Sequence, residues 1–238
     1  MSTFHFQHFS VTQYASGMKV CTDATLFGAM APVSGGERVL DIGTGTGLLS
    51  LMAAQLGADN ITAVEITSDA YQEAVDNFTA SPWSDRLRAV HGDVGDFARA
   101  TEERYDLIIC NPPFFEDHLK AATAIRSTAR HTDQLPFPNL ITAVDKLLTD
   151  VGLLYLLLPI HAVERFCRLA AVAGIHLVNR TDIRGYSRNS AKVSALTFRR
   201  KPMAFISRLL TIYREERVYS GESERYLVDF LLRFQSRR

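Results

Sequence analysis

Four consecutive residues, Asn111-Pro112-Pro113-Phe114, have the side chains best suited in this sequence to chemistry on an amino group. They follow an apolar run, residues 105–110, of the kind that forms a buried strand. The Asn111 side-chain carbonyl and the Pro112 main-chain carbonyl can accept hydrogen bonds from both N–H bonds of an exocyclic amine. Such an amine is a poor nucleophile because its lone pair is delocalised into the ring. Two acceptors let the nitrogen become more tetrahedral, so the motif suits group transfer to nitrogen.

The residues after Asn111 suit recognition of a flat ring. Pro113 restricts Pro112 to extended geometry, and Phe114 offers a face on which a base can stack, worth about 1–3 kcal/mol. A strand-end Asn-Pro turn with a core phenylalanine is the structural alternative for the motif. The following connection, residues 114–134, contains further candidates to contact a substrate base: Phe115, Arg126, Arg130 and His131.

A glycine turn lies upstream, in Asp41-Ile42-Gly43-Thr44-Gly45-Thr46-Gly47. A turn of this kind between a strand and a helix brings backbone N–H groups and a helix N-terminus to one point, with no Cβ to obstruct a ligand. The dinucleotide-binding fingerprint requires a glycine three residues after Gly45, and Leu48 stands there. The turn therefore predicts a cofactor site that is not of the nicotinamide type.

Acidic residues accompany the first three predicted strands. Asp41 lies near the end of the first, Glu65 lies at the end of the second beside Ile66, and Asp93 follows the third beside Val94. A carboxylate at the position of Glu65 can accept both ribose hydroxyls of an adenosine cofactor. Each carboxylate alone can be a solvated strand end. Because all three carboxylates occur near the ends of successive predicted strands, we expect them to form one cofactor site, with Ile66 and Val94 among its residues.

Apolar runs alternate with amphipathic segments over most of the chain, which predicts βαβ units and a largely parallel sheet. We expect strands at 38–42, 60–66, 88–91, 105–110 and 152–158, and helices at 48–56, 68–80, 135–148 and 161–173. Residues 176–183 and 192–199 predict an antiparallel hairpin. A β-like segment, 209–213, and an amphipathic helix, 222–234, follow.

The length of 238 residues fits one α/β domain, with an N-terminal extension (1–34), a core (35–200) and a C-terminal addition (201–238). The chain begins without a basic-then-apolar leader, and its longest apolar run, 151–158, is far below the roughly 20 residues of a membrane helix. Cys21, Cys110 and Cys167 are scattered, and no Cys/His spacing suggests a metal site. We expect a cytoplasmic protein without membrane or metal partners, and nothing requires more than a monomer.

The net charge of zero conceals an asymmetry. Residues 1–119 contain 6 Lys and Arg against 16 Asp and Glu, whereas residues 120–238 contain 20 against 10. A basic face on the second half would attract polyanions, although arginines on solvated helix faces would give the same count. The asymmetry favours a nucleic-acid substrate.

The glycine turn and the Asn111 motif together resemble the S-adenosylmethionine-dependent amino methyltransferases. Over nearly its whole length, the chain resembles the bacterial tRNA1(Val) adenine-37 N6-methyltransferases. The resemblance is carried by Phe9-Ser10-Val11, Met18-Lys19-Val20-Cys21-Thr22-Asp23, the glycine turn, Asn111-Pro112-Pro113-Phe114-Phe115 with Arg126 and Arg130, and Leu210-Thr211-Ile212-Tyr213. One departure is Cys21, where this family typically has glycine, so the local turn is expected to differ.

The resemblance implies a class I methyltransferase fold: Rossmann-like, doubly wound, with a mostly parallel seven-stranded sheet and a C-terminal antiparallel hairpin. It implies S-adenosylmethionine as cofactor and N6 of adenine 37 in the tRNA1(Val) anticodon loop as target. Asp41 would order the glycine turn and the amino-acid end of the cofactor, and Asp93 would accept a hydrogen bond from the adenine amino group. Lys19, Thr22 and Asp23 are candidates to lie near the methionine end, although we expect Asp23 chiefly to cap a helix.

Other readings of the motifs remain open. Release-factor glutamine methyltransferases share the glycine turn but usually have tyrosine at the position of Phe114 and a helical N-terminal domain, which residues 1–34 cannot supply. Ribosomal RNA guanine-N2 methyltransferases share the Asn111 motif and are often longer, and DNA adenine methyltransferases normally add a recognition domain. A cofactor-binding RNA scaffold without activity is a different class, against which the intact Asn111 motif speaks.

Overall fold

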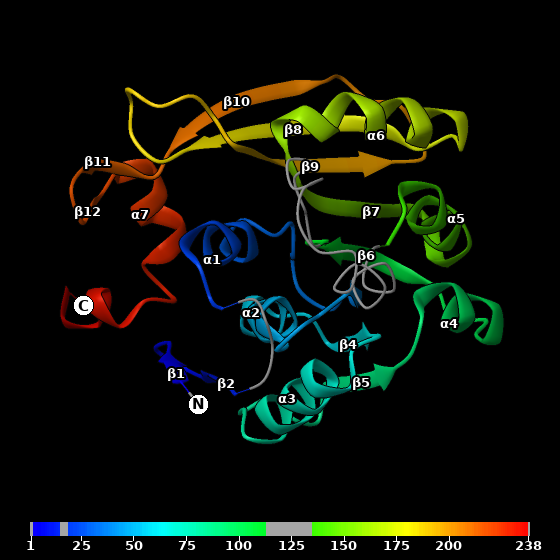
Figure 1. Cartoon of the computed structure of the whole chain (residues 1–238), viewed down its shortest axis with the longest axis horizontal. Coiled ribbons are helices and arrows are strands. Elements are labelled where there is room, and N and C mark those ends of the chain that lie inside the picture. The colour runs from blue at the N-terminus through cyan, green and yellow to red at the C-terminus, as the bar shows by residue number, and fades with distance from the viewer. Residues whose placement is uncertain (1, 15–18, 113–134, 238) are drawn as a thin grey trace, which may run out of the picture.

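The computed structural model describes residues 2–14, 19–112 and 135–237, which form a central sheet with helices on both faces (Figure 1). In this part of the chain the sheet has eight strands, in the order β10-β8-β9-β7-β6-β3-β4-β5. The strands are β3 (Arg38–Ile42), β4 (Asn60–Glu65), β5 (Leu87–His91), β6 (Tyr105–Cys110), β7 (Leu148–Pro159), β8 (His176–Arg184), β9 (Val193–Arg199) and β10 (Ile206–Thr211). Only β9 runs antiparallel to its neighbours.

Helices cover both faces because alternate side chains of the central strands point in opposite directions. Leu107 and Ile109 belong to one core cluster, whereas Ile108 and Cys110 belong to the other. The first cluster packs under α1 (Thr22–Ala29), α2 (Leu48–Leu56), α3 (Ser68–Thr79) and α7 (Gly221–Leu227), and the second under α4 (Val94–Ala100), α5 (Phe137–Leu147) and α6 (Ile160–Val172). None of the helices in the described ranges is long and apolar enough to cross a membrane.

This architecture confirms the class I fold and the β8–β9 hairpin, and it corrects the count of strands. The predicted seven-stranded sheet has an eighth member, β10, which pairs in parallel with β8. Leu210 is buried while Ile206 and Leu209 are about half exposed, as befits an edge strand. The sequence predicted a β-like segment here but gave no sign of its partner.

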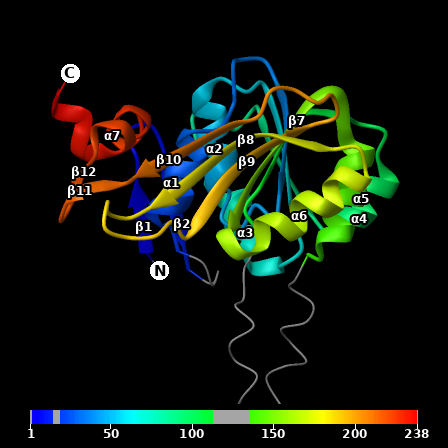
Figure 2. The same ribbon diagram turned by 90° about the horizontal axis from the view of Figure 1, so that it is seen from above.

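The N-terminal and C-terminal additions meet at one end of the molecule (Figure 2). Neither the hairpin of β1 (Ser2–His5) and β2 (Ser10–Gln13) nor the ribbon of β11 (Tyr213–Glu215) and β12 (Val218–Tyr219) was predicted. The predicted helix 222–234 is wrong beyond Leu227, and a 3₁₀ turn follows at Leu232–Arg237. Just past the end of α7, Gln7 of the N-terminal segment donates to the carbonyls of Val228 (2.7 Å) and Leu231 (2.9 Å).

Candidate active site

Four strand ends bring Asn111, Gly43, Glu65 and His91 to one level of the sheet. Ile42 pairs with both Cys110 and Val64, and Glu65 pairs with His91, so the residues that follow lie opposite one another. Adjacent strands are about 4.8 Å apart, so this row spans roughly 14 Å. The strand order reverses between β3 and β6, the position at which open α/β sheets bind ligands outside their carboxyl ends.

The glycine turn leaves an open cradle at this edge. Gly43, Gly45 and Gly47 have φ angles of +69°, +58° and +85°, in the left-handed region that favours glycine. A Cβ on Gly43 or Gly45 would meet no atom within 4 Å, so both face open space. A Cβ on Gly47 would clash with the Phe78 ring of α3. The first two glycines therefore leave room for a ligand, whereas Gly47 is required for packing.

Replacing Gly47 by alanine is expected to lower the free energy of unfolding by roughly 2–4 kcal/mol, through left-handed backbone strain and the clash with Phe78. Gly43→Ala is the matched control, because it has the strain without the clash and should lose about 1 kcal/mol. Urea unfolding of both variants measures the difference. Equal losses would show that the contact with Phe78 does not decide the role of Gly47.

Asp41 is a buried carboxylate with one unused oxygen. Its Oδ2 accepts hydrogen bonds from the Thr44 hydroxyl (2.6 Å) and the Ser50 hydroxyl (2.7 Å). Its Oδ1 is buried and has no hydrogen-bond partner within the described ranges. Burial raises the pKa of Asp41 to about 6, while the two hydroxyls oppose this shift and the charge of Glu65 adds to it. The unused acceptor fits a ligand that brings a donor or a positive charge. Sequence patterns did not single out Thr44 or Ser50.

Glu65 fastens the glycine turn to the end of β4. It is 7% exposed, and its two oxygens accept the backbone N–H groups of Gly45 (2.9 Å) and Thr67 (2.8 Å). Each oxygen retains a further acceptor site, so the carboxylate can also take ribose hydroxyls. The next residue, Ile66, is 46% exposed. Its carbonyl lies 3.1 Å from His91 Nε2, so an apolar side chain and an imidazole flank the predicted ribose site.

Asp93 and Val94 follow the next strand. Asp93 is the N-cap of α4, where its Oδ1 accepts from the backbone N–H groups of Gly95 (2.8 Å) and Asp96 (3.1 Å). The Asp93 side chain is exposed, whereas Val94 is buried in the core beneath α4. This short helix was not predicted, because seven residues give little periodic signal. The contacts of Asp93 and Val94 with a cofactor stay predictions.

Only the first part of the Asn111 motif lies within the described residues. Asn111 is partly exposed and Pro112 is buried, directly after β6. The other predicted catalytic and substrate-binding residues lie outside the described residues: Phe114, Phe115, Arg126, Arg130 and His131. Their roles therefore stay predictions. In the described ranges, no group of three His, Cys, Asp or Glu side chains could hold a metal ion.

The start of α1 corrects one prediction. The N-cap is Cys21, which makes no side-chain capping bond, and Asp23 is the second residue of the helix. Asp23 therefore does not cap it, although its place in the first turn is favourable for a carboxylate. Burial raises the pKa of Asp23, and the charge of Lys192 opposes the shift. Thr22 Oγ1 lies 3.1 Å from the Tyr213 hydroxyl, and Lys19 is exposed.

Known proteins resemble this chain in sequence and in fold. The family model described as "Methyltransferase small domain" matches residues 18–135. A Flavobacterium psychrophilum protein named "tRNA1(Val) (adenine(37)-N6)-methyltransferase" is 40% identical over 92% of this chain and 94% of its own length. A protein of the same name from Trichodesmium erythraeum is 36% identical over 97% of this chain and 98% of its own.

Two solved structures share the fold at low sequence identity. A predicted O-methyltransferase from Agrobacterium tumefaciens superposes with a TM-score of 0.62 at 17% identity, over 85% of this chain and 94% of that one. The glycopeptide N-methyltransferase MtfA, complexed with sinefungin, gives 0.53 at 14% identity, over 72% and 89%. Identity of 36–40% over nearly the full length of both proteins, together with this fold, shows that the chain belongs to the family of the tRNA1(Val) (adenine(37)-N6)-methyltransferases.

Proposed function

We propose that this protein transfers a methyl group from S-adenosylmethionine to N6 of an adenine in a tRNA anticodon loop, adenine 37 of tRNA1(Val). The observation that carries the proposal is the register that places Asn111 directly beside the glycine turn. The two relatives named above, aligned over nearly their full length, support the choice of substrate. We propose further that the enzyme acts in the cytoplasm, as a monomer and without a metal ion.

The described residues fit the cofactor. Gly43 and Gly45 leave open space in which the cofactor would lie. The Glu65 carboxylate would accept hydrogen bonds from the ribose hydroxyls, and the unused Oδ1 of Asp41 would face the amino-acid end of the cofactor. When bound, S-adenosylmethionine supplies a methyl group on a positively charged sulfur. Ile66, with Asp93 and Val94 beyond it, would adjoin the adenine end, and Lys19, Thr22 and Asp23 the methionine end.

The reacting amine is held by residues at the end of β6. The Asn111 side-chain carbonyl and the Pro112 main-chain carbonyl accept one N–H bond each, which favours a tetrahedral nitrogen and stabilises the positive charge that develops on it. No base of altered pKa is required, because the nitrogen can release its extra proton to water after the transfer. In this proposal Phe114 stacks on the adenine, and Phe115, Arg126, Arg130 and His131 contact the surrounding RNA.

Cofactor binding is expected to weaken as the pH falls below about 6. The binding measurement uses S-adenosylhomocysteine, the cofactor without its methyl group, which has the same ammonium group. Above pH 6 the Asp41 carboxylate is ionised and attracts this ammonium group, whereas below pH 6 the carboxyl is neutral. The dissociation constant should therefore rise by up to about tenfold for each pH unit below the pKa. Calorimetric titrations from pH 5 to 8 measure this, with Asp41→Asn as the pH-insensitive control. An identical pH profile in the two proteins would remove Asp41 from the cofactor site.

The proposed function is tested by incubating the enzyme with labelled S-adenosylmethionine and total tRNA, and identifying the labelled nucleoside after digestion. N6-methyladenosine is the expected product. N2-methylguanosine from ribosomal RNA, or label in glutamine of a protein substrate, would favour the alternative methyltransferases. Cofactor binding without transfer to any of these substrates would favour a non-catalytic scaffold.

A further inference from the structure

Four aromatic side chains from distant parts of the C-terminal half form one continuous row. Successive ring centroids are 5.6 Å apart for Tyr186 and Tyr213, 5.0 Å for Tyr213 and Tyr219, and 5.9 Å for Tyr219 and Phe234. The three tyrosines are each partly exposed, whereas Phe234 is buried. This aromatic row therefore presents tyrosine rings to solvent and is anchored at its Phe234 end.

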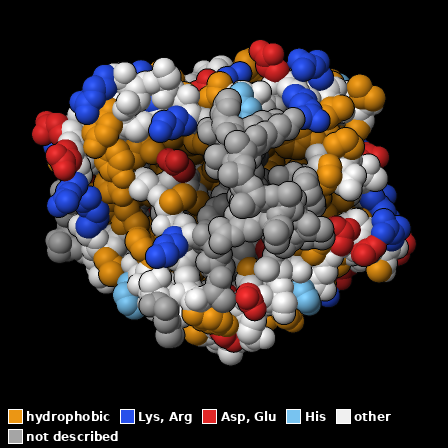
Figure 3. Space-filling view, in the orientation of Figure 1, with side chains coloured by type: hydrophobic (Ala, Val, Ile, Leu, Met, Phe, Trp, Pro, Cys, Tyr) orange, Lys and Arg blue, Asp and Glu red, His pale blue; other side chains and the backbone are white. Residues whose placement is uncertain are grey.

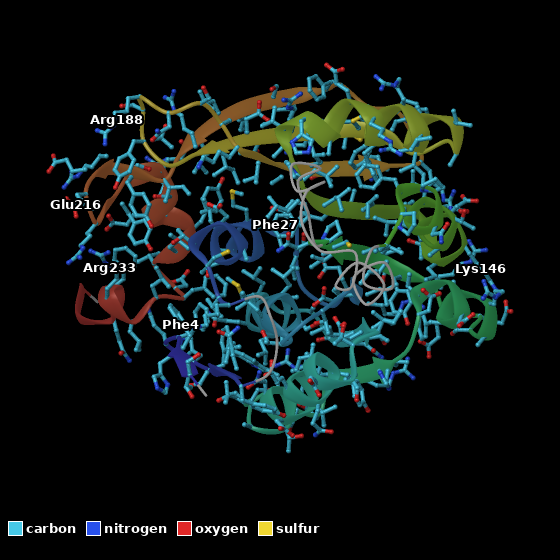
Figure 4. All side chains as sticks on the ribbon, viewed as in Figure 1. Phe4, Phe27, Lys146, Arg188, Glu216 and Arg233 are labelled. Atoms are coloured by element: carbon cyan, nitrogen blue, oxygen red, sulfur yellow. The ribbon has the colours of Figure 1, made fainter. Side chains whose placement is uncertain are left out.

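An exposed arginine lies against each end of the aromatic row. The guanidinium of Arg188 is 4.8 Å from the centre of the Tyr186 ring, and that of Arg233 is 5.0 Å from the Tyr219 ring. Neither arginine forms an ion pair with an acidic side chain of the described ranges. Figure 4 shows the two on opposite sides of α7, with Glu216 at the outer margin. Both cations are thus free to attract an anion.

The surface around the aromatic row combines flat apolar groups with positive charge. Figure 3 shows apolar side chains over α7, with Lys and Arg side chains around them and Asp and Glu side chains at the outer margin. The β8–β9 connection, residues 185–192, contains Arg188 and Lys192 and no acidic residue. The β11–β12 ribbon contains two arginines and two glutamates and is neutral. With α7 (Glu222, Glu224 and Arg225), Asp229 and Arg233 counted as well, the surroundings of the row have a net charge of +1. The positive side chains that can attract a polyanion are Arg188, Lys192 and Arg233.

The aromatic row lies on the same edge of the sheet as Asn111. Strands β8 and β10 run parallel to β6, and Tyr186 and Tyr213 each stand two residues beyond the end of their strand. Three strand spacings separate β6 from β8 and four separate it from β10. The register also places Tyr186 and Tyr213 five residues further along their strands than the level of Asn111, so these rings lie roughly 22–25 Å from Asn111. An RNA strand that delivers a base to Asn111 can therefore reach the row with nucleotides several positions away from the target base.

Two sets of contacts fix the aromatic row relative to the active site. The backbone N–H of Tyr213 donates to the Gly185 carbonyl (2.8 Å), and the Tyr213 hydroxyl lies 3.1 Å from Thr22 Oγ1 at the start of α1. Further along α1, the Phe27 ring stacks on Tyr155 of β7 with centroids 4.2 Å apart. Tyr155 pairs with Ile109, two residues before Asn111. A rigid helix thus joins the row to the strand that carries Asn111.

We propose that the aromatic row, with Arg188 and Arg233, is a stacking platform for unpaired nucleotides several positions away from the target adenine, an inference that rests on the proposed function. Bases of single-stranded RNA stack on aromatic rings and guanidinium planes, and arginines also neutralise phosphates. The platform holds the RNA strand while the target base lies at Asn111.

The test compares wild type with three variants: Arg188→Gln/Arg233→Gln, Arg188→Lys and Tyr186→Leu. The matched control is Arg104→Gln, an exposed arginine just before β6 at the opposite edge of the sheet. The probes are fluorescent oligoadenylate and an unmodified tRNA1(Val) transcript. The double variant should bind both at least about tenfold more weakly and raise KM for tRNA by a similar factor. Arg188→Lys should also weaken binding, because the variant loses the planar guanidinium group that stacks on bases, although it keeps the positive charge.

The outcomes separate this proposal from the proposed function. If wild type methylates the tRNA but the double variant keeps both affinities and KM, the platform is refuted and the function stands. If wild type fails to methylate the tRNA while the double variant and Tyr186→Leu lose affinity for oligoadenylate, the platform stands and the function fails. Melting temperatures of all variants close to that of wild type would show that lost binding is not lost folding.

Discussion

Replacing Asn111 by alanine is expected to lower the rate of methyl transfer by at least about 10²–10³-fold at saturating tRNA and cofactor. The side chain supplies one of the two acceptors that hold the target amine, and its loss removes stabilisation that matters most as charge develops on the nitrogen. Cofactor affinity should change by less than about tenfold, because the glycine turn, Asp41 and Glu65 remain. Single-turnover assays with labelled cofactor measure the first quantity and calorimetry the second.

The Asn111→Asp variant is the matched control for this experiment. It keeps an acceptor oxygen at nearly the same position, so it should retain far more activity than the alanine variant. An alanine variant that reacts at the wild-type rate would contradict the proposed role of Asn111. A loss of cofactor binding as large as the loss of rate would instead assign Asn111 to the cofactor alone.

Replacing Glu65 by alanine is expected to raise the dissociation constant for the cofactor by about 10²-fold or more, since charge-assisted hydrogen bonds contribute about 1.5–3 kcal/mol each. The variant loses the acceptor for the ribose hydroxyls. It also releases the backbone N–H groups of Gly45 and Thr67, which the carboxylate now holds in place. The glycine turn should therefore become less ordered as well as less attractive to the ligand.

Glu37→Ala separates these two effects. The Glu37 carboxylate also accepts two backbone N–H groups, from Ser34 (2.7 Å) and Gly35 (2.9 Å), but it precedes β3 at the opposite edge of the sheet. The Glu37→Ala substitution should lower the melting temperature with little effect on cofactor affinity. A Glu65→Ala protein that binds S-adenosylhomocysteine as tightly as wild type would rule out the ribose contact.

Much of the fold could be predicted from the sequence because its signals are local. The buried strands and amphipathic helices of the core have strong apolar patterns, and α2 was predicted with its observed limits, 48–56. The place of β10 in the sheet could not be predicted, because its pairing with β8 joins residues 206–211 to residues 179–184, and no local pattern indicates which strand pairs with which. The carbonyls just past α7 accept hydrogen bonds from Gln7, which lies more than 220 residues away in the sequence, so local patterns could not indicate this contact.

The candidate site likewise contains residues that could be predicted from the sequence and residues that could not. Gly43, Glu65 and Asn111 could be placed together because parallel strands end at one edge, and the observed register brings them side by side. Thr44 and Ser50 were missed, because nothing in a sequence tells which hydroxyl turns towards Asp41. The aromatic row was missed because its members come from three segments that meet only in the folded protein.

We propose that this enzyme methylates N6 of one adenine in an anticodon loop. The most direct test incubates it with S-adenosylmethionine and two transcripts of tRNA1(Val), one with adenine and one with guanine at position 37. Mass spectrometry of nuclease fragments then locates the methyl group. We expect a single N6-methyladenosine at position 37 of the first transcript and no methylation of the second. Equal methylation of both transcripts, or a methyl group at any other position, would contradict it.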